Sequence, residues 1–378
     1  MEMAPMTDGF RAVQGSGSDW HVACARCLER LSGLPPGANL GFVYASEPLA
    51  DALDLIVARL REATGVSDWV GTGAAAVCAN GQEHFQGGTI VAMVAALPAN
   101  SFRLFDRLED STPEHDPASA AWRRREPVGC GVVHADPRQA DVAATIARLS
   151  EASSAFLVGG LTSANSSAMQ IAGRPTEGGI SGVLFSVDVP VVTGLSQGCS
   201  PVGPAHEVTA SQGPWILSLD GRPAIDVLKE DIGEVLARNL DRVVGFIHVA
   251  LPIVGADRPD YVVRNLLAVD LRRGIIAVGD QLRVGTPLMF VKRDPTTAHA
   301  DLQRMLEDLS RRTAGRPIRG ALYHTCVARG PHMFGPDSAE LKTIEQALGP
   351  VPLAGFFTNG EIFRDRLYSY SGVLTLFL

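Results

Sequence analysis

The sequence of 378 residues is poor in charged and in aromatic side chains. Charged residues make up 20% of the chain and aromatic residues 6%, whereas 46% of the residues are hydrophobic. This balance is typical of a well-packed globular protein, and the length suits two domains better than one small core. The net charge of −8 argues against a nucleic-acid-binding surface and against a patch that binds anionic membranes.

The sequence also lacks a membrane-spanning run and a signal peptide. The longest apolar runs, 89–97 and 243–251, are far shorter than the roughly 20 residues that a spanning helix needs. Residues 1–18 contain neither a basic region nor a long apolar stretch, and their Gly, Ser and Asp content predicts a loose tail. We therefore expect a cytoplasmic protein with no membrane partner.

Cysteine is scarce, and only one pair of cysteines is close in sequence. Cys24 and Cys27 share a predicted helical face with Trp20 and Leu31. A redox pair would follow a strand and open a helix, and a zinc site would need a second such pair. Neither pattern is present, so both cysteines are interpreted as small core residues.

What the sequence does contain is an internal repeat of strand, helix, strand, hairpin and strand. Copies begin near residues 40, 128 and 319. The spacing from Gly71 to Gly88 is 88 − 71 = 17 residues, which equals 372 − 355 = 17 for Gly355 and Gly372. A fourth, poorer copy covers 244–291, and chance similarity of α/β segments remains an alternative to true duplication.

The repeat predicts mixed sheets. Helical crossovers favour parallel neighbours and Asn-Gly turns favour antiparallel ones, with helices covering the sheet faces. The predicted fold class is α/β, with two modules of mixed β-sheet and flanking helices built from these units. We place a tail and first helix at 1–37, an N-terminal module at 38–225 and a C-terminal module at 226–378. A loop rich in Gly, Pro and Ser is predicted at 194–204.

No motif fixes a reaction. The segment 71–76 resembles the dinucleotide fingerprint but lacks the carboxylate about 20 residues further on, so its glycines are better explained by close backbone packing. A nucleophile at Cys199 or Ser200 would need a base, for which His206 is the nearest candidate. A hydrolase or transferase that uses this loop is one alternative, and two structural loop residues are the other. His324 and Cys326 share a strand face, which favours a packed strand end over a metal site.

Two charged residues near the C-terminus suit a small zwitterion. Arg329 lies in a loop between a strand and a helix, and Glu361 follows the turn Asn359-Gly360. A guanidinium binds a carboxylate through two parallel hydrogen bonds, and a carboxylate accepts an amine. The pair therefore suits an amino acid. The alternative is that the two residues form a salt bridge or are solvated ends.

Four motifs that run in a fixed order resemble the FIST family across residues 38–378. They are Gly159-Gly-Leu-Thr-Ser163, Gly198-Cys-Ser-Pro-Val-Gly203 with 219–224, Cys326-Val-Ala-Arg-Gly330, and Gly355-Phe-Phe-Thr-Asn-Gly-Glu-Ile362. The resemblance implies a sensory or signal-transduction module that binds a small ligand, for which amino acids are the proposed class. The candidate ligand-binding residues in these motifs are Thr162, Ser163, Cys199, Ser200, Cys326, Arg329, Asn359 and Glu361.

The resemblance also raises a cofactor and a partner. Some bacterial relatives bind haem and sense nitric oxide through partner kinases. Nine histidines offer axial ligands here, but no C-x-x-C-H motif exists, so any haem would be non-covalent. No F-box, kinase or methyl-accepting segment is visible, which implies a separate signalling partner such as a kinase or cyclase. An adaptor that binds no ligand is the remaining alternative.

Overall fold

The computed structural model describes residues 6–108, 121–238, 240–253 and 260–378. The chain forms two compact units. The first contains residues up to 196, 301–367 and 371–378, and the second contains 197–300 and 368–370. Helices and mixed sheets are both present, as the α/β prediction requires. The second unit is therefore inserted into the chain of the first.

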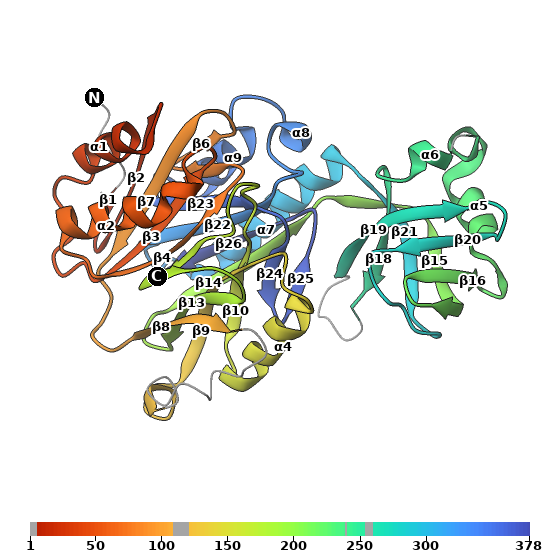
Figure 1. The fold of residues 1–378 in the computed structure, drawn as a ribbon, viewed down its shortest axis with the longest axis horizontal. Helices are drawn as coiled ribbons and strands as arrows, with labels where there is room; N and C mark the ends of the chain where they lie inside the picture. The colour runs from red at the N-terminus through yellow and green to blue at the C-terminus, as the bar shows by residue number, and fades with distance from the viewer. Residues whose placement is uncertain (1–5, 109–120, 239, 254–259) are drawn as a thin grey trace. The chain divides into compact units, whose positions relative to one another are not determined.

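The first unit contains three repeats of one pattern: an edge strand, a central strand, a helix, a parallel strand, a hairpin and a return strand (Figure 1). Repeat 1 comprises β2 (Phe10–Gly17), β3 (Leu40–Ser46), α2 (Leu53–Thr64), β4 (Asp68–Ala74), β5 (Val77–Ala79), β6 (Gln82–His84) and β7 (Gly88–Ala95). Repeat 2 comprises β8 (Phe102–Leu108), β9 (Val128–Ala135), α4 (Val142–Ser153), β10 (Phe156–Leu161), β11 (Gln170–Ala172), β12 (Arg174–Thr176) and β13 (Ile180–Ser186). Repeat 3 comprises β14 (Val191–Gln197), β22 (Gly320–Cys326), α9 (Ala339–Leu348), β23 (Leu353–Thr358), β24 (Glu361–Arg364), β25 (Arg366–Tyr368) and β26 (Ser371–Phe377). The pattern is accompanied by β1 (Met6–Thr7), α1 (Trp20–Arg30), the 3-10 turn η1 (Ala50–Ala52), α7 (Pro295–Thr313) and α8 (Pro331–Phe334).

Each of the three sheets is completed by a hairpin from a different repeat. The sheet of repeat 1 receives β11 and β12 from repeat 2, the sheet of repeat 2 receives β24 and β25 from repeat 3, and the sheet of repeat 3 receives β5 and β6 from repeat 1. The central pairs β3–β4, β9–β10 and β22–β23 are parallel, and the exchanged hairpins pair antiparallel. The exchange is cyclic, so no repeat forms its complete sheet from its own strands.

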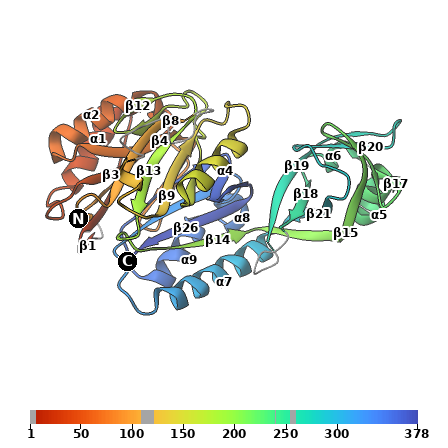
Figure 2. The ribbon, with the colours of Figure 1, turned by 90° about the horizontal axis from the view of Figure 1, so that it is seen from below.

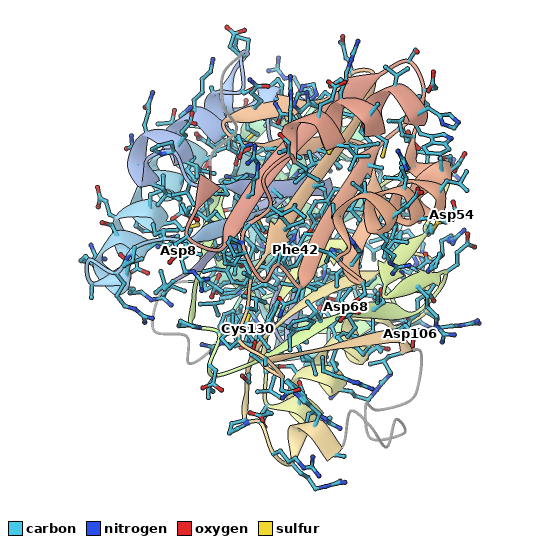
Figure 3. All side chains as sticks on the ribbon, turned by 90° about the vertical axis from the view of Figure 1, so that its left-hand side faces the viewer. Asp8, Phe42, Asp54, Asp68, Asp106 and Cys130 are labelled. Atoms are coloured by element: carbon cyan, nitrogen blue, oxygen red, sulfur yellow. The ribbon has the colours of Figure 1, made fainter. Side chains whose placement is uncertain are left out.

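The three sheets share one apolar core, which includes Phe42, Cys130, Phe356 and Phe377. Figure 3 shows Phe42 and Cys130 inside this unit and Asp54 and Asp106 at its periphery. On the outer face of the first sheet, α1 packs against β2, β7 and α2, and its Cys24 and Cys27 are buried there as predicted. Figure 2 shows α7 and α9 lying along the sheet that contains β26.

One glycine position is common to all three repeats. It lies on the second strand of each parallel pair, where an added Cβ would overlap the carbonyl oxygen of the paired residue on the central strand. The glycines are Gly71, Gly159 and Gly355, paired with Val43, Val133 and Tyr323. Close backbone approach therefore explains these glycines, in agreement with the interpretation of 71–76 as packing rather than as a nucleotide-binding loop.

The second unit is a closed antiparallel barrel. Its strands are β15 (Cys199–Gln212), β16 (Trp215–Leu219), β17 (Arg222–Pro223), β18 (Ile247–Pro252), β19 (Tyr261–Asp270), β20 (Ile275–Val278) and β21 (Pro287–Arg293), with helices α5 (Ala224–Ala237) and α6 (Leu240–Val243). The order β15-β21-β18-β19-β20-β16 is closed by pairing of β16 with β15. Closure leaves this ring of strands without a free edge.

Three sequence expectations are wrong. The segment 244–291 is not a further copy of the repeat, because its strands pair antiparallel in the barrel. The predicted loop 194–204 is instead the end of β14 and the start of β15, paired in part with β21. Residues 10–17 of the predicted loose tail form β2, which pairs with β7 along its whole length, while 1–5 lie outside the described residues. Among the described residues, every helix is too short or too polar to cross a membrane.

Candidate functional site

A buried ionic group lies at the carboxyl end of β22, the end of a parallel strand at which α/β proteins commonly bind ligands. The guanidinium of Arg329 is 1% exposed. Its Nε and Nη2 atoms donate to Oε1 of Glu340 at 2.9 and 2.6 Å. The Tyr323 hydroxyl donates to the same oxygen at 2.5 Å, and Arg329 Nη2 lies 3.3 Å from Oγ of Ser196. We call Ser196, Tyr323, Arg329 and Glu340 the ionic set of repeat 3.

The other two repeats place uncharged residues at the corresponding positions. The strand registers align the three central strands. When residues are counted from these aligned positions, Arg329 corresponds to Gln139 in repeat 2 and to Leu49 in repeat 1. Gln139 donates to the Thr145 hydroxyl of α4 at 3.1 Å. Leu49 is buried in the apolar cluster that also contains Ile56 of α2. The fold therefore accepts apolar, polar or ionic pairs at this position.

The ionic set has one unused donor. Nη1 of Arg329 is buried and has no hydrogen-bond partner among the described residues. The guanidinium carbon lies 4.8 Å from the ring of Phe334, which provides no hydrogen-bond acceptor. Burial lowers the pKa of Arg329, but the charge of Glu340 outweighs burial, so the pKa is raised and the side chain stays charged. A buried charged donor without a partner points to a missing acceptor, because such groups are rarely left unpaired.

A second acid reaches the ionic set on the exchanged hairpin. Glu83 lies in β6, opposite Cys78 of β5, and both its carboxylate oxygens are buried. Burial and the charge of Glu340 raise the pKa of Glu83 to about 7, although the N–H of Leu341 and the charge of Arg329 lower it. The corresponding hairpin residue beside the sheet of repeat 1 is Pro175. Two acids thus lie around one guanidinium at this site.

Phe85 covers this corner of the first unit. Its ring packs on Phe357 with 4.4 Å between the ring centroids, and it lies against Gly330, the residue after Arg329. The side chain is 37% exposed. Phe85 is therefore a solvent-facing side chain next to the buried ionic set.

Arg329 and Glu361 form neither the salt bridge nor the solvated ends that were the alternatives, and their joint binding of a zwitterion stays a prediction. Glu361 is buried, where its Oε1 accepts from the Thr358 hydroxyl at 2.7 Å and its Oε2 from the Ser371 hydroxyl at 2.7 Å. Burial raises its pKa to about 7, and the hydrogen bonds of Thr358 and Ser371 lower it. Its counterpart in the hairpin of repeat 2 is Gln170, whose Oε1 accepts from the Ser181 hydroxyl at 2.6 Å. The hydrogen bond of Glu361 to Ser371 therefore has a structural counterpart in repeat 2, which makes it with the uncharged side chain of Gln170.

Four other predicted residues lie at the same ends of β10, β22 and β23. Ser163 is buried, where it accepts from the N–H of Ala75 at 2.9 Å and donates to the carbonyl of Phe357. Asn359 is exposed, and its Nδ2 donates to the carbonyl of Thr162 at 3.3 Å. Cys326 ends β22 and is buried. The structure therefore brings Thr162, Ser163 and Asn359 together, mainly through hydrogen bonds to backbone groups. The Thr162 hydroxyl is buried and has no hydrogen-bond partner among the described residues.

The remaining predicted residues, Cys199 and Ser200, belong to the barrel unit. Cys199 is buried at the start of β15, and the Ser200 hydroxyl lies 3.3 Å from Oδ2 of Asp294. Both ring nitrogens of His206 are taken by carboxylates, so neither is directed at the Cys199 thiol. The expected loop is a β-ladder, and the predicted base His206 is bound to Asp220 and Asp231 instead.

Two histidines and a tyrosine meet where the central strands of the three repeats converge. They are Tyr44 of β3, His134 of β9 and His324 of β22, which occupy corresponding positions. The Tyr44 hydroxyl lies 3.3 Å from Nε2 of His324 and 3.4 Å from Nε2 of His134, and Phe356 packs on all three rings. Burial lowers the pKa of His324 to about 3 and that of His134 well below its usual value. Both imidazoles are therefore neutral, and the predicted packed strand end at His324 is confirmed.

A cavity of about 380 Å³ lies near the amino ends of β3 and β4. Its lining residues are Ala38, Asn39, Gly65, Val66, Ser67, Asp68, Asn100 and Phe102. The Asn39 side chain is already bonded to both backbone groups of Leu97. None of the predicted site residues lines this cavity, so it serves as a contrast to the ionic set.

The residues that sequence reasoning missed are Glu340, Glu83, Tyr323 and Ser196. Glu340 had a local signal, because it stands four residues before Ile344 on the face of α9 that is predicted to point inward. Tyr323 also had one, since it aligns with Val43 and Val133 in the repeat. Glu83 had none, because its site depends on which sheet receives the hairpin.

The fold and the site define a repeat-built α/β protein with a buried ionic set. Within the described ranges no group of three or more His, Cys, Asp or Glu residues is placed to hold a metal ion. Residues 39–222 match the FIST N domain, and residues 224–364 match the FIST C domain. The chain therefore belongs to the FIST family, as the resemblance implied, and FIST domains are associated with sensory signal transduction and ligand binding.

The similar curated proteins come from mycobacteria. An uncharacterized protein of Mycobacterium tuberculosis is 35% identical over 201 residues, which are 50% of this chain and 51% of the relative. An uncharacterized protein of Mycobacterium bovis is 37% identical over 204 residues, which are 50% of each chain. The chain spans about half the length of these relatives. Their names state no ligand or partner, and the predicted module limits of 38–225 and 226–378 stay a prediction.

Proposed function

We propose that this protein is a ligand-binding sensory protein that recognises an amino acid at the ionic set of repeat 3. The observation that carries the proposal is the buried Nη1 of Arg329, which has no partner among the described residues. A ligand carboxylate supplies the charged acceptor that this donor needs. The signal would pass to a separate partner such as a kinase or cyclase, and the cytoplasmic location stays a prediction.

The second acid of the site supports a zwitterion rather than a simple carboxylate. Glu83 and Glu340 together outnumber the single guanidinium, and burial with this repulsion raises the pKa of Glu83 to about 7. A ligand ammonium beside Glu83 would relieve the repulsion and favour the ionised carboxylate. Glu83 thus takes the role that the sequence assigned to Glu361.

The test compares ligands and variants in pairs. Thermal unfolding of the native protein is followed with each standard amino acid and, for any that binds, with the same acid lacking its amino group. An amino acid at 100 times its dissociation constant should add about 2.7 kcal/mol to the free energy of unfolding. Glu83→Gln should weaken binding of the amino acid about tenfold or more, because it removes a charged hydrogen-bond partner.

Two controls isolate the site. The Glu83→Gln exchange should leave binding of the acid without the amino group unchanged. Asp68→Asn alters the separate cavity and should affect neither ligand. An unaltered response of Glu83→Gln to the amino acid, or sensitivity to Asp68→Asn, would refute this site. No response to any amino acid would favour the adaptor role.

A haem-based nitric oxide sensor is the alternative that the family raises, and three of the described histidines fit haem poorly. His134 and His324 are fully buried with their Nε2 atoms turned to Tyr44, and His206 is held by two carboxylates. His115 lies outside the described residues. Titration of the purified protein with haem tests this alternative, since a saturable Soret band would support it and its absence would remove it.

A further inference from the structure

A histidine of the barrel unit bridges two carboxylates. His206 lies in β15, with its Nδ1 atom 2.6 Å from Oδ2 of Asp220 at the β16–β17 turn. Its Nε2 atom is 2.9 Å from Oδ2 of Asp231 in α5. A neutral imidazole has one N–H and donates only one of these bonds, whereas the protonated ring donates both. The geometry is therefore that of a protonated His206.

The two carboxylates differ in their access to water. The side chain of Asp231 is 6% exposed and that of His206 is 10% exposed, whereas that of Asp220 is 46% exposed. A neutral His206 would keep its single N–H on Asp231, because a buried carboxylate without a donor is strongly unfavourable. Water can solvate Asp220 instead. Loss of the proton therefore loosens the contact with Asp220.

We propose that His206 is a protonation-dependent latch that holds the β16–β17 turn to helix α5 across β15. The charged form fixes the turn, and the neutral form releases it. This latch lies in the barrel unit and is independent of the proposed amino-acid site in the first unit.

The charged groups around His206 come from three elements. Arg222 of β17 forms a 2.8 Å ion pair with Glu230 of α5, which joins the same two elements without His206. On β15, the N–H of Glu207 donates to Oδ1 of Asp220 at 2.8 Å. From β21, the ring of Phe290 faces His206 at 6.3 Å and carries no charge. The latch therefore acts beside one salt bridge that joins the same region of the barrel unit and contains no histidine.

The direction of the pH dependence follows from the two carboxylates. Burial lowers the pKa of His206, but the hydrogen bonds and charges of Asp220 and Asp231 outweigh burial and raise the pKa above 6.5. The unfolded value is about 6.5, so the latch stabilises the fold fully below that pH. The stabilisation is lost as the pH rises through the folded-state pKa. The latch thus responds to pH in the range above 6.5.

Nuclear magnetic resonance of the full chain tests the latch. Side-chain nitrogen shifts give the titration midpoint of His206. Hydrogen exchange of the Glu207 amide, corrected for its intrinsic pH dependence, reports whether Asp220 is held in place, because this amide donates to Asp220. In the native protein the exchange rate should rise about tenfold as His206 loses its proton. Asp231→Asn should lower the midpoint by about one unit, because it removes a neighbouring negative charge.

Two controls complete the test. The first control is His206→Gln, which should abolish the step in the exchange rate of the Glu207 amide. The second is His299, whose Nδ1 bonds the carbonyl of Pro295 on α7. Its side-chain nitrogen shifts should be the same in the native protein and in Asp231→Asn. Equal midpoints in the native protein and in Asp231→Asn would overturn the proposal. So would Glu207 exchange that shows no step at the midpoint.

Discussion

Repeat 3 and its two counterparts use the same backbone but different chemistry at one position. In repeat 1 the residue at this position is Leu49, which is buried in an apolar cluster that also contains Ile56 of the following helix. In repeat 2 the contact at this position is a neutral hydrogen bond between Gln139 and Thr145. In repeat 3 it is the buried ion pair of Arg329 with Glu340.

This comparison separates what the fold requires from what it merely accepts. Replacing a buried ion pair by packed apolar residues is often neutral or stabilising, whereas removing one partner is strongly destabilising. Since repeats 1 and 2 fold without charge at this position, the ionic set is not needed to build the sheet. We infer that it serves ligand recognition.

The largest expected loss of stability concerns the glycine position that the three repeats share. Alanine at Gly71, Gly159 or Gly355 places Cβ on a backbone carbonyl that cannot move without breaking the parallel pair. Each single variant should lose more than about 4 kcal/mol of stability and show little cooperative unfolding in urea. Gly279→Ala in the barrel is a control for chain flexibility, since its added Cβ meets only ordinary contacts, with the nearest atom 3.7 Å away. A mild effect in any one repeat would break the equivalence of the three sheets.

The next largest loss of stability concerns the loop–helix contact, which is ionic in repeat 3 and uncharged in repeat 2. Glu340→Ala leaves the guanidinium of Arg329 buried and unpaired, and should lower the free energy of unfolding by about 3 to 5 kcal/mol. The matched change in repeat 2, Thr145→Val, removes the hydroxyl that accepts from Gln139 and from Arg148, and should cost about 1 to 2 kcal/mol. Urea unfolding at pH 7 measures both. Equal losses would contradict the difference between the repeats.

A smaller effect is expected for Glu361 and its counterpart Gln170. The folded-state pKa of Glu361 is about 7 against an ordinary value of 4.5, so the folded protein binds this proton more tightly. Its contribution to stability therefore falls as the pH rises from about 4.5 to about 7. Glu361→Gln should remove this slope and be roughly 2 to 3 kcal/mol more stable than the native protein at pH 8. Gln170→Glu should introduce such a slope, and parallel stability curves for all three proteins would contradict the assignment.

Much of the first unit could be predicted from the sequence, because apolar periodicity and turn residues are local signals. The strands at 40–45, 128–134 and 319–325 and the helices that follow them lie where the sequence places them. The cyclic exchange of hairpins could not be predicted. The turn Asn80-Gly81 specifies a hairpin, but nothing in its sequence says which sheet receives it.

The same reason limits prediction of the site. Arg329 was identified from its residue type and loop position, and it was grouped with Glu361, which follows a turn, as a pair that suits a zwitterion. The actual partner, Glu340, stands on a helix face that also carries Leu341 and Ile344, so the apolar pattern concealed it. The barrel was missed because its closing strand β15 is rich in Gly and Pro near 198–204, which is typical of a loop.

The most direct test gives repeat 3 the uncharged chemistry of repeat 1. The variant combines Arg329→Leu and Glu340→Ile with Tyr323→Phe and Ser196→Ala, which remove the hydroxyls that bond the ion pair. We predict a free energy of unfolding within about 2 kcal/mol of the native value and complete loss of stabilisation by amino acids. Amino-acid binding that persists in this variant, or a loss of more than about 5 kcal/mol of stability, would contradict a functional role for the ionic set.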